Sequence, residues 1–509
     1  MKSVIKRNLT VIMSWVWLVL LGGCDSGFIE TNTNPVQPTA MNPVYLFSNA
    51  QLASSFTTHT MTYEMGIVQQ MMNPFAGVNA GGNVNQLNAD QAQGGWNNYY
   101  NNVVKRLVDV LDKTKDVPER SNLYQMTRIW HSFAFMILSD TYGDVPYTEA
   151  GLGYLNGNYF PVYDTQESIY NSILTTLDQA VNALDASKPI ETGDLFYSGD
   201  IVKWKKLGNS LLLRAAMRLS KVDPSKAEEY TAKAIAGGVM TSNDDNCFMR
   251  HSATYESPFN TFLNGSEKVN FYLGGPFVEY LKTTADPRLP VIAVKYENPS
   301  LNPGSTPEDR EPSRQIGMPY GYDNLSISTA PGFPGTAGAG YKYSQADRAT
   351  LVKLDAPMFF VTYAQTALLM AEAAYRGWIS GDENDLYQTG IEAHFKQLEQ
   401  YDSDAKVDPV KAVEYLSKAT LTAGKELELI NTQYWVASFL NGPEAWSNFR
   451  RSGFPMLKPN PYPGKSIKGD FIKRLVYPIN ESVVNRENYN AAVSRLGEDD
   501  LDSKVWWDK

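Results

Sequence analysis

Apolar residues recur every three or four positions over long parts of the chain, which is the spacing of one buried helix face. Residues 44–72 and 96–115 carry this pattern, and it continues through LYQMTRIWHSFAFMIL and IVKWKKLGNSLLLRAAMRLSKV. Asp164 with Glu167 three residues later predicts an N-cap and a capping box before the next helix. Asp223 before a proline predicts another helix start, and Gly237 predicts its end.

The predicted helices follow one another through short connections, which favours pairs of packed amphipathic helices. No strict 34-residue consensus is visible in these stretches. We therefore predict a mainly α fold, built as an irregular array of the tetratricopeptide type. The helical pattern returns after residue 355 and continues to about residue 455.

Two parts of the chain lack this periodicity. The first is NPFAGVNAGGNVNQLNADQAQGG, a Gly/Asn/Gln-rich loop of a length that is usually functional or disordered. The second is residues 239–354, which are rich in Pro, Gly, Asn and Tyr. We predict one unit over 43–509, with a helical framework at 43–238 and 355–455 and a loop-rich insertion at 239–354.

The N-terminus has the features of a bacterial lipoprotein signal. A short positive region precedes an apolar run that is too short to span a membrane, and LGGC follows it. We predict a signal peptide at 1–23, lipid attachment at Cys24 and a polar tether at 24–42. The other cysteine, Cys247, then has no partner, so packing and not a disulfide framework holds the fold.

The formal net charge of −10 limits which partners the protein is expected to bind. Such a balance repels nucleic acid and anionic membrane surfaces, so neither is expected to bind the folded part. Aromatic residues make up 12% of the chain, with 30 Tyr, and tyrosine-rich surfaces are typical of recognition.

Motifs for phosphate, zinc and nucleophilic chemistry are absent from the sequence. PGKS lacks the first glycine of a phosphate loop, and HExxH, CxxC and GxSxG do not occur. The four His do not share metal-ligand spacing, so we expect no metal and no cofactor. A structural calcium stays open, because its oxygen ligands can come from any part of a chain.

The segment SDTYGDVPYTEA, residues 139–150, resembles a hallmark of the SusD/RagB family of outer-membrane nutrient-binding lipoproteins. Further blocks resemble the family in the family's order: KWKKLGNSLLLRAAMRLS, ADPRL, TYAQTALLMAEAAYRGW, YQTGIEAHF, INTQYWVASFLNGPEAWSNFRRSGFP and RLVYPINE. Together they cover nearly the whole mature chain and are most similar to the starch-binding-associated, SusD-like branch. Gln365 stands where the family often has Glu.

The resemblance implies a SusD-like fold and a protein that is not an enzyme. Such proteins bind oligosaccharides, or in some members peptides, and cover a SusC-like TonB-dependent transporter of the outer membrane. The acidic turn then belongs to the framework. Asp140 and Asp144 are expected to cap or hydrogen-bond turn backbone, while Gly143 relieves the bend and Pro146 blocks continuation of the helix.

In the family the ligand face combines the first long loop with the loop-rich insertion. Sugars stack their C–H faces on aromatic rings and bind polar side chains through their hydroxyls. By position, the resemblance nominates Phe75, Asn79, Asn83, Asn85, Gln86, Trp96, Tyr320, Tyr322 and Tyr341. Tyr255 and Tyr272 are secondary candidates, and Trp96 has an alternative role as a core anchor at the start of its helix.

Three alternatives remain at this point. A peptide-binding lid of the same transporter type would keep the partner and change the cargo. An exported α-helical glycosidase would depend on a pair of carboxylates, and with 55 Asp and Glu the sequence cannot identify such a pair. A tetratricopeptide-type scaffold would bind only protein, through a helical groove.

Overall fold

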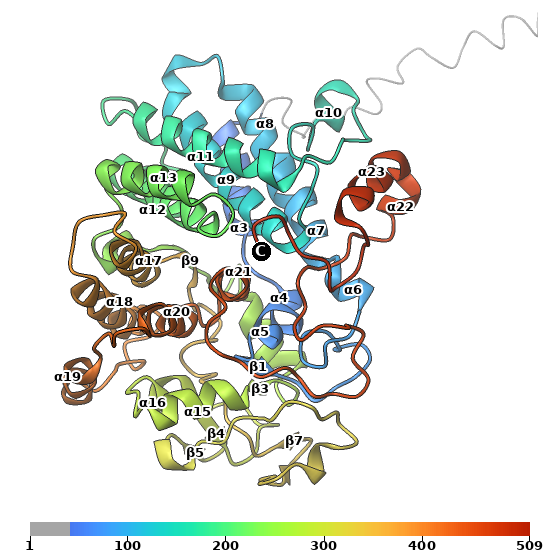
Figure 1. The fold of residues 1–509 in the computed structure, drawn as a ribbon, viewed down its shortest axis with the longest axis vertical. Helices are drawn as coiled ribbons and strands as arrows, with labels where there is room; N and C mark the ends of the chain where they lie inside the picture. The colour runs from blue at the N-terminus through green and yellow to red at the C-terminus, as the bar shows by residue number, and fades with distance from the viewer. Residues whose placement is uncertain (1–40) are drawn as a thin grey trace, which may run out of the picture. The chain divides into compact units, whose positions relative to one another are not determined.

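α-Helices make up most of the regular structure in the computed structural model, which describes residues 41–509 (Figure 1). Its compact unit is Pro43–Lys509. The predicted signal peptide, the lipid site Cys24 and the tether up to residue 40 lie outside the described residues and stay predictions.

The first helices form where the three-to-four spacing of apolar residues predicted them. In α9, for example, Leu123, Met126, Trp130 and Phe133 all lie in the core. The α-helices are α3 (Pro43–Ala53), α4 (Thr58–Thr62), α5 (Glu64–Ile67), α6 (Ala89–Ala92), α7 (Gly94–Asn98), α8 (Lys105–Thr114), α9 (Ser121–Tyr142), α10 (Gly153–Asn156), α11 (Gln166–Ala183), α12 (Ile201–Arg218) and α13 (Pro224–Gly237). A π-helical turn, Tyr99–Val104, joins α7 to α8.

The second half of the framework is built in the same way. Its helices are α17 (Tyr363–Tyr375), α18 (Glu383–Leu398), α19 (Pro409–Lys418), α20 (Glu426–Ala437), α21 (Gly442–Ser452), α22 (Glu481–Val484) and α23 (Arg486–Leu496). Successive helices pack on each other from α8 through α9, α11 and α12 to α13, and α17 packs on α18 and α20. Contacts between α12 and α17 join the two halves, so the predicted mainly α, irregular helical array is confirmed.

The helix caps test the sequence predictions residue by residue. Asp223 caps α13 by accepting from the Lys226 amide at 3.1 Å, as predicted. The prediction of Asp164 as the cap of α11 is wrong. Thr165 takes that role, because the Asp164 carboxylate instead accepts the backbone amides of Tyr147 and Thr148, both at 2.9 Å.

Residues 239–354 contain only short elements. The helices are α14 (Pro258–Asn260), α15 (Gly275–Thr283) and α16 (Leu289–Ile292), with a π-helical turn at Thr261–Ser266. The strands of the described chain are β1 (Met71–Met72), β2 (Cys247–Met249), β3 (Tyr272–Leu273), β4 (Ala293–Tyr296), β5 (Glu308–Asp309), β6 (Thr336–Ala337), β7 (Gly340–Tyr341), β8 (Gln345–Ala346) and β9 (Met358–Val361). They form the antiparallel pairs β1–β3, β2–β9 and β6–β7 and the three-stranded sheet β5–β4–β8.

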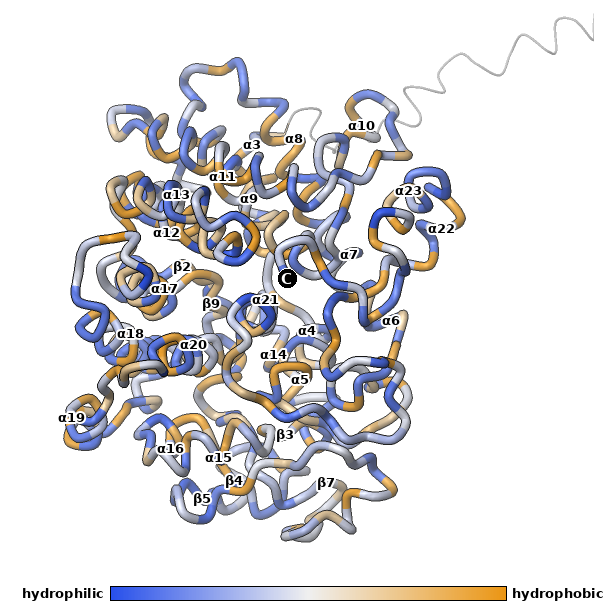
Figure 2. The backbone as a smooth tube through the Cα atoms, viewed as in Figure 1, coloured by the Kyte–Doolittle hydropathy of each residue, from blue (hydrophilic) through white to orange (hydrophobic). Residues whose placement is uncertain are grey.

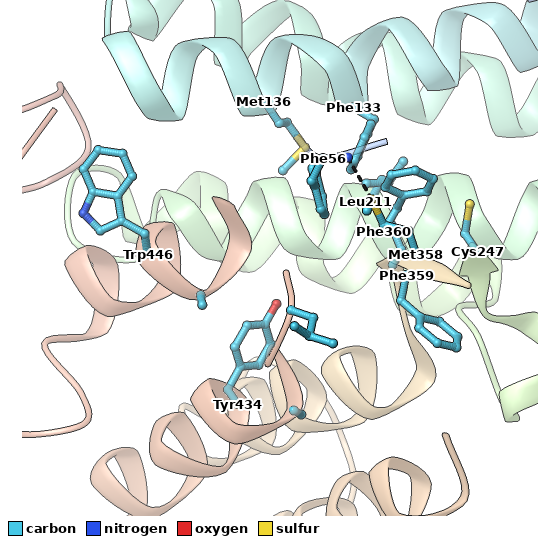
Figure 3. Packing of buried hydrophobic residues seen from close by; sticks show 14 of the residues in the cluster. Phe56, Phe133, Met136, Leu211, Cys247, Met358, Phe359, Phe360, Tyr434 and Trp446 are labelled. Carbon is cyan, nitrogen blue, oxygen red and sulfur yellow. Dashed lines mark hydrogen bonds between the residues drawn. The ribbon is translucent and has the colours of Figure 1, made fainter. Parts of the chain in front are cut away.

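The main core lies between the framework helices and the β2–β9 ribbon. Along the helices in Figure 2, hydrophobic and hydrophilic residues alternate as on amphipathic helices. Figure 3 shows Phe133 of α9 beside Phe360 of β9, and their ring centroids lie 5.6 Å apart. Cys247 is buried at this ribbon with a free thiol. No helix of the described chain is both long and apolar enough to cross a membrane.

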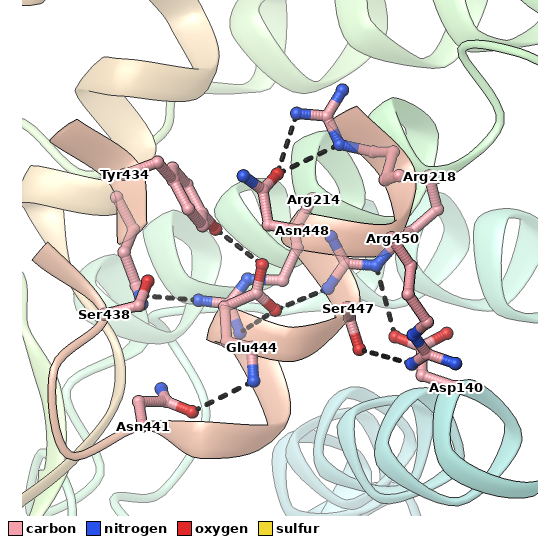
Figure 4. Close-up of polar contacts among 12 residues, drawn as sticks. Asp140, Arg214, Arg218, Tyr434, Ser438, Asn441, Glu444, Ser447, Asn448 and Arg450 are labelled. Atoms are coloured by element: carbon pink, nitrogen blue, oxygen red, sulfur yellow. Dashed lines mark hydrogen bonds and ion pairs between the residues drawn. The ribbon is translucent and has the colours of Figure 1, made fainter. Parts of the chain in front are cut away.

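The end of α9, where the acidic segment begins, is part of a buried ionic network (Figure 4). The Asp140 carboxylate accepts from Arg218 Nε at 3.2 Å and from Trp507 Nε1 at 2.9 Å, and also from the Tyr170 hydroxyl. Arg218 Nη2 also donates to Glu444 at 2.6 Å. The prediction that Asp140 binds turn backbone is therefore wrong, because α9 continues past this residue and directs its side chain into the core.

The other residues of the turn behave nearly as predicted. Asp144 accepts the backbone amide of Gln166 at 2.9 Å, so it binds the start of α11 and not its own turn. Gly143 has a φ of +84°, which confirms that it relieves the bend. The turn is a junction between helices, and its carboxylates are neutralised by arginine or occupied by backbone donors.

Candidate ligand-binding face

The first long loop and the insertion meet through β1 and β3. Met71 pairs with Leu273, and Met72 pairs with Tyr272. Gly274 makes the approach possible, because a Cβ there would lie 2.2 Å from the Gln69 carbonyl oxygen. Residues 73–88 therefore leave β1 directly beside the insertion, and this brings together the two segments that the sequence nominated.

Residues 73–88 are held to α4 and α5 by close backbone contact. A Cβ at Gly82 would lie 2.3 Å from the Tyr63 carbonyl oxygen, so no larger residue fits without a shift. Asn83 is 1% exposed and braces the loop from inside. Its amide nitrogen donates to the carbonyl oxygens of Asn73 at 2.8 Å and Phe75 at 3.0 Å. The loop thus has one defined backbone conformation.

The polar candidates on this loop have different surroundings. Asn85 is buried with a φ of +51°, and Gln86 donates to the Gly464 carbonyl oxygen at 2.7 Å. Asn79 donates to Glu267 of the insertion at 2.9 Å. Phe75 and Asn79 are half-buried, so they remain reachable, whereas Asn83 and Asn85 face inward.

A second, smaller hydrophobic cluster contains six aromatic residues of the insertion, and we call these six rings the aromatic cluster. Its members are Tyr272, Tyr320, Tyr322, Phe333, Tyr341 and Tyr343. Ring centroids lie 5.9 Å apart for Tyr272 and Tyr341, and 6.2 Å apart for Phe333 and Tyr343. The three tyrosines nominated from the sequence in the insertion all belong to this cluster.

Two of the tyrosines fix the backbone. Tyr320 donates its hydroxyl to the carbonyl oxygen of Met71 at 2.7 Å, across to the end of the first loop. Tyr272 donates to Val269 at 2.5 Å and accepts the Tyr341 amide at 2.8 Å. Burial raises the pKa of both hydroxyls well above the usual range. Tyr320 therefore joins the two loops and presents only part of its ring.

The other three hydroxyls lack such anchors. Tyr343 is 2% exposed, and its hydroxyl has no hydrogen-bond partner among the described residues. Burial, with Tyr322 and Tyr341 close by, raises the pKa of Tyr343 to about 12. This hydroxyl is enclosed, so the partly exposed rings of Tyr322 and Tyr341 are the ones that a ligand can reach.

A third segment, residues 455–466, closes the face. Asn460 donates to the Asn83 carbonyl oxygen at 2.5 Å, and Tyr462 donates to Asp323 at 3.1 Å. Ser326 and Tyr462 hydrogen-bond Asp323 and lower its pKa, so this carboxylate is charged at neutral pH. The sequence analysis missed this segment, although KPNPYPGK, like MPYGYDN, is rich in Pro, Gly, Asn and Tyr.

The remaining candidates lie outside the aromatic cluster. Trp96 is 6% exposed in the framework, where its ring contacts Tyr100, Tyr142 and Tyr477 at 4.7, 5.3 and 5.8 Å. Tyr255 donates to the Leu52 carbonyl oxygen at 2.8 Å. Trp96 has the surroundings of a packing residue, whereas Tyr255 is 37% exposed, and a binding role for either of them stays a prediction.

The chemistry of the face is that of recognition. Partly exposed rings stand beside amide, hydroxyl and carboxylate groups, which is the combination that binds a ligand with both C–H and O–H surfaces. Within residues 41–509, no cluster of three or more His, Cys, Asp or Glu could hold a metal ion. A cavity of about 540 Å³ between α17, α18 and residues 241–244 contains a single aromatic ring, that of Tyr363.

Known families and solved structures resemble this chain over most of its length. Residues 35–478 match the SusD-like family described as starch-binding associating with outer membrane. A solved chitin-binding protein is 34% identical, with a TM-score of 0.80 over 92% of this chain and 100% of that chain. A Bacteroidetes AC2a SusD-like structure is 26% identical, with the same TM-score and coverage.

A more distant structure, a chitin-binding SusD homolog from Flavobacterium johnsoniae, is 24% identical. It has a TM-score of 0.75 over 92% of this chain and 98% of that chain, and at this identity it supports the fold alone. A search of curated proteins found no match. The family match over most of the chain and the 34% identical structure agree with the mainly α fold and with the residue blocks, and this chain belongs to the SusD-like family.

Proposed function

We propose that this protein binds oligosaccharides without cleaving them and delivers them to a SusC-like TonB-dependent outer-membrane transporter. The observation that carries the proposal is the aromatic cluster, where the rings of Tyr322 and Tyr341 are partly exposed. Partly exposed rings beside polar side chains suit a sugar, whose faces are apolar and whose edges carry hydroxyl groups.

The choice of sugar to test first comes from the 34% identical structure, which is named a chitin-binding protein. Chitin oligosaccharides carry N-acetyl groups, whose methyl groups can pack on rings and whose amides can bind Asn79 or Asp323. We therefore propose chitin oligosaccharides as the first ligands to test, with starch oligosaccharides next because of the family description.

The proposed location is the outer membrane, through lipid on Cys24, on the cell surface. Support comes from LGGC after the apolar run and from the family description, which includes the outer membrane. Labelling with a radioactive fatty acid, compared between the natural chain and Cys24→Ala, would test the anchor. An unlabelled natural chain would contradict it.

Calorimetric titration of residues 25–509 tests the binding function. We expect an intact chitin or starch oligosaccharide to bind, and we expect Tyr322→Ala and Tyr341→Ala to weaken binding at least tenfold. Val413→Ala is the control, because Val413 is exposed on α19 and belongs to no part of the face. Each mixture is then analysed for products.

The alternatives give different results in the same experiment. Binding of peptides alone would change the cargo and keep the transporter partner. Shortened sugars in the mixture would indicate a glycosidase and contradict the proposal. Absence of binding to any sugar or peptide would leave only a scaffold that binds protein.

A further inference from the structure

The cavity of about 540 Å³ on the helical framework shares no residue with the ligand-binding face. We call it the α17–α18 cavity, because it lies between these helices and the turn at residues 241–244. Its lining includes Ser242, Asp244, Tyr363, Thr389, Glu392 and Lys396. Figure 1 shows α17 and α18 on one side of the ribbon and β7, which carries Tyr341, at its lower end. Pockets for small ligands commonly measure about 300–1,000 Å³, so this cavity has room for one.

Hydrogen bonds fix the walls of the cavity relative to one another. The Asn243 side chain donates to the Ala393 carbonyl oxygen of α18 at 2.9 Å. The backbone amide of Tyr363, at the start of α17, donates to Asn246 at 2.7 Å, and Asn246 donates to Gln400 at 2.8 Å. α17 also packs directly on α18. A site whose walls are already in place loses little freedom when a ligand binds, which favours affinity.

Several polar groups of the cavity are not used by the protein itself. Tyr363 and Thr389 are half-buried, and neither hydroxyl forms a hydrogen bond with another of residues 41–509. Asp244 is exposed, and its carboxylate has no ion-pair partner in the same range. Burial, with Glu392 close by, raises the pKa of Tyr363. Its hydroxyl therefore keeps its proton at neutral pH and can both donate and accept a hydrogen bond.

This combination of groups suits an uncharged sugar. A sugar ring has an apolar C–H face that can stack on the Tyr363 ring, and its hydroxyls can bind hydroxyl and carboxylate groups. Among the described lining residues, Ala393 is the one hydrophobic residue besides Tyr363, so the cavity offers no apolar pocket for a peptide side chain. The same lining has the carboxylates of Asp244 and Glu392 but only the ammonium of Lys396, and this excess of negative charge disfavours acidic sugars.

We propose that the α17–α18 cavity is a second saccharide-binding site, which takes an uncharged sugar unit. The Tyr363 ring stacks on the sugar, while Asp244 and Thr389 bind its hydroxyls. This inference rests on the proposed function, since it assumes that the protein binds sugars. A second site lets one protein hold two sugar chains, or one long chain at two points, which strengthens binding without any new contact at the ligand-binding face.

Saturation-transfer NMR of residues 25–509 with chitotriose and maltotriose tests the site apart from the ligand-binding face. The starting chain carries Tyr322→Ala and Tyr341→Ala, which remove the two partly exposed rings of the face. We expect this chain to keep binding at least one of the two sugars. Addition of Tyr363→Ala should then raise the Kd at least tenfold. Trigalacturonate, an acidic sugar, should bind the starting chain at least tenfold more weakly than the uncharged sugar does.

Tyr375→Ala in the same starting chain is the matched control. Tyr375 is a 40% exposed tyrosine of the same helix, α17, and it does not line the cavity, so binding should stay unchanged. A further variant, Thr389→Trp, fills the cavity and keeps Tyr363. The Thr389 side chain is only half-buried, so we expect this chain to fold and to bind the sugar at least tenfold more weakly. Circular dichroism checks the fold of each variant.

The outcomes separate this inference from the proposed function. If the natural chain binds sugar and the starting chain does not, the second site is wrong and the proposed function stands. Equal affinities of the Tyr363→Ala and Tyr375→Ala chains would also overturn the inference, as would a cavity that binds peptides and no sugar. If the natural chain binds no sugar at all, the proposed function itself fails, and this inference fails with it.

Discussion

At the residue scale, the tyrosines of the aromatic cluster divide by what their hydroxyls contact. Tyr320 and Tyr272 donate to backbone carbonyl oxygens, whereas Tyr343 has no partner among the described residues. A hydroxyl bound to backbone contributes to stability, whereas the partly exposed side chain of Tyr322 is available to a ligand. Residues of one type on one face therefore have separable roles.

This division predicts opposite results for two conservative substitutions. Tyr320→Phe removes the hydrogen bond to Met71 and should lower the free energy of unfolding by about 1 kcal/mol with little change in sugar affinity. Tyr322→Phe should leave stability unchanged and weaken sugar binding roughly two- to tenfold. Urea unfolding and calorimetric titration of both variants give the comparison. Equal effects in both assays would contradict the division of roles.

Glu64 is a buried carboxyl group that should make stability depend on pH. It is 1% exposed, and burial raises its pKa from 4.5 to about 8. The folded protein therefore keeps a proton on Glu64 that the unfolded chain releases above pH 4.5. This contribution is complete below pH 4.5 and is lost as the pH rises toward 8, by at most about 1.4 kcal/mol per pH unit.

The substitution Glu64→Gln removes this titration. Relative to the natural chain, the variant should gain stability steadily between pH 5 and pH 8, as measured by urea unfolding at each pH. Glu414→Gln, at a half-exposed side chain on α19, is the control and should run parallel to the natural chain. A Glu64→Gln curve that is also parallel would show that Glu64 has an ordinary pKa.

Sequence reasoning at this scale nominated Tyr320, Tyr322 and Tyr341 by their position in the insertion, and Gly and Asn neighbours mark Tyr320 and Tyr322 as loop residues. It missed Tyr343, which lies beside a strand in YKYSQAD, and Tyr462, which lies more than 100 residues away. Both reach the face through tertiary contacts. The backbone roles of Asn83 and Asn85 could not be predicted either, since a loop asparagine has the same local sequence whether it faces inward or outward.

At the scale of elements, the periodicity of apolar residues predicted which segments form helices. It did not predict how the helices are joined. The apolar stripe of α12 predicted Trp204, Leu207 and Leu211 on its buried face, and all three are in the core. The role of Asp140 depended on Arg218 and Trp507, which reach it from distant parts of the chain. Local sequence has no information on such partners, so a turn rich in acids was predicted to bind its own backbone.

The buried ionic network allows a prediction of how stability changes when one of its charged side chains is removed. Arg218 of α12 is fully buried and contacts both Asp140 of α9 and Glu444 of α21. Arg218→Met leaves two carboxylates buried without their main partner and should cost about 3–5 kcal/mol of unfolding free energy. Asp140→Asn with Glu444→Gln in the same chain should restore part of that loss. Urea unfolding of the single and triple variants measures both effects.

Lys396→Met is the matched control for the network, because Lys396 forms an exposed ion pair with Glu392 on α18. Its loss should change stability by about 0–1 kcal/mol. A loss for Arg218→Met no larger than this would show that the buried charges are not held by the arginine.

At the scale of the whole molecule, the last residues of the chain pack into the core. There they lie among helices that precede them by hundreds of residues. Trp507 is fully buried, donates to Asp140 at 2.9 Å and lies under the guanidinium of Arg450, whose carbon is 4.8 Å from the ring centroid. The sequence analysis predicted no element in this tail, because a short segment without periodicity shows no sign of where it packs.

The two neighbouring tryptophans, Trp506 and Trp507, allow a controlled test of this closing role. Trp507→Ala opens a cavity in the core and removes one of the three donors to Asp140, so it should lower the free energy of unfolding by about 3–5 kcal/mol. Trp506 is only half-buried, and Trp506→Ala should cost clearly less. Loss of Trp507 should also weaken the contact between α9 and α12, since Asp140 and Arg218 join these helices. Hydrogen exchange in both helices should therefore rise in Trp507→Ala and stay near the natural level in Trp506→Ala. Equal losses of stability in the two variants would mean that the tail lies on the surface of the framework and is not part of its core.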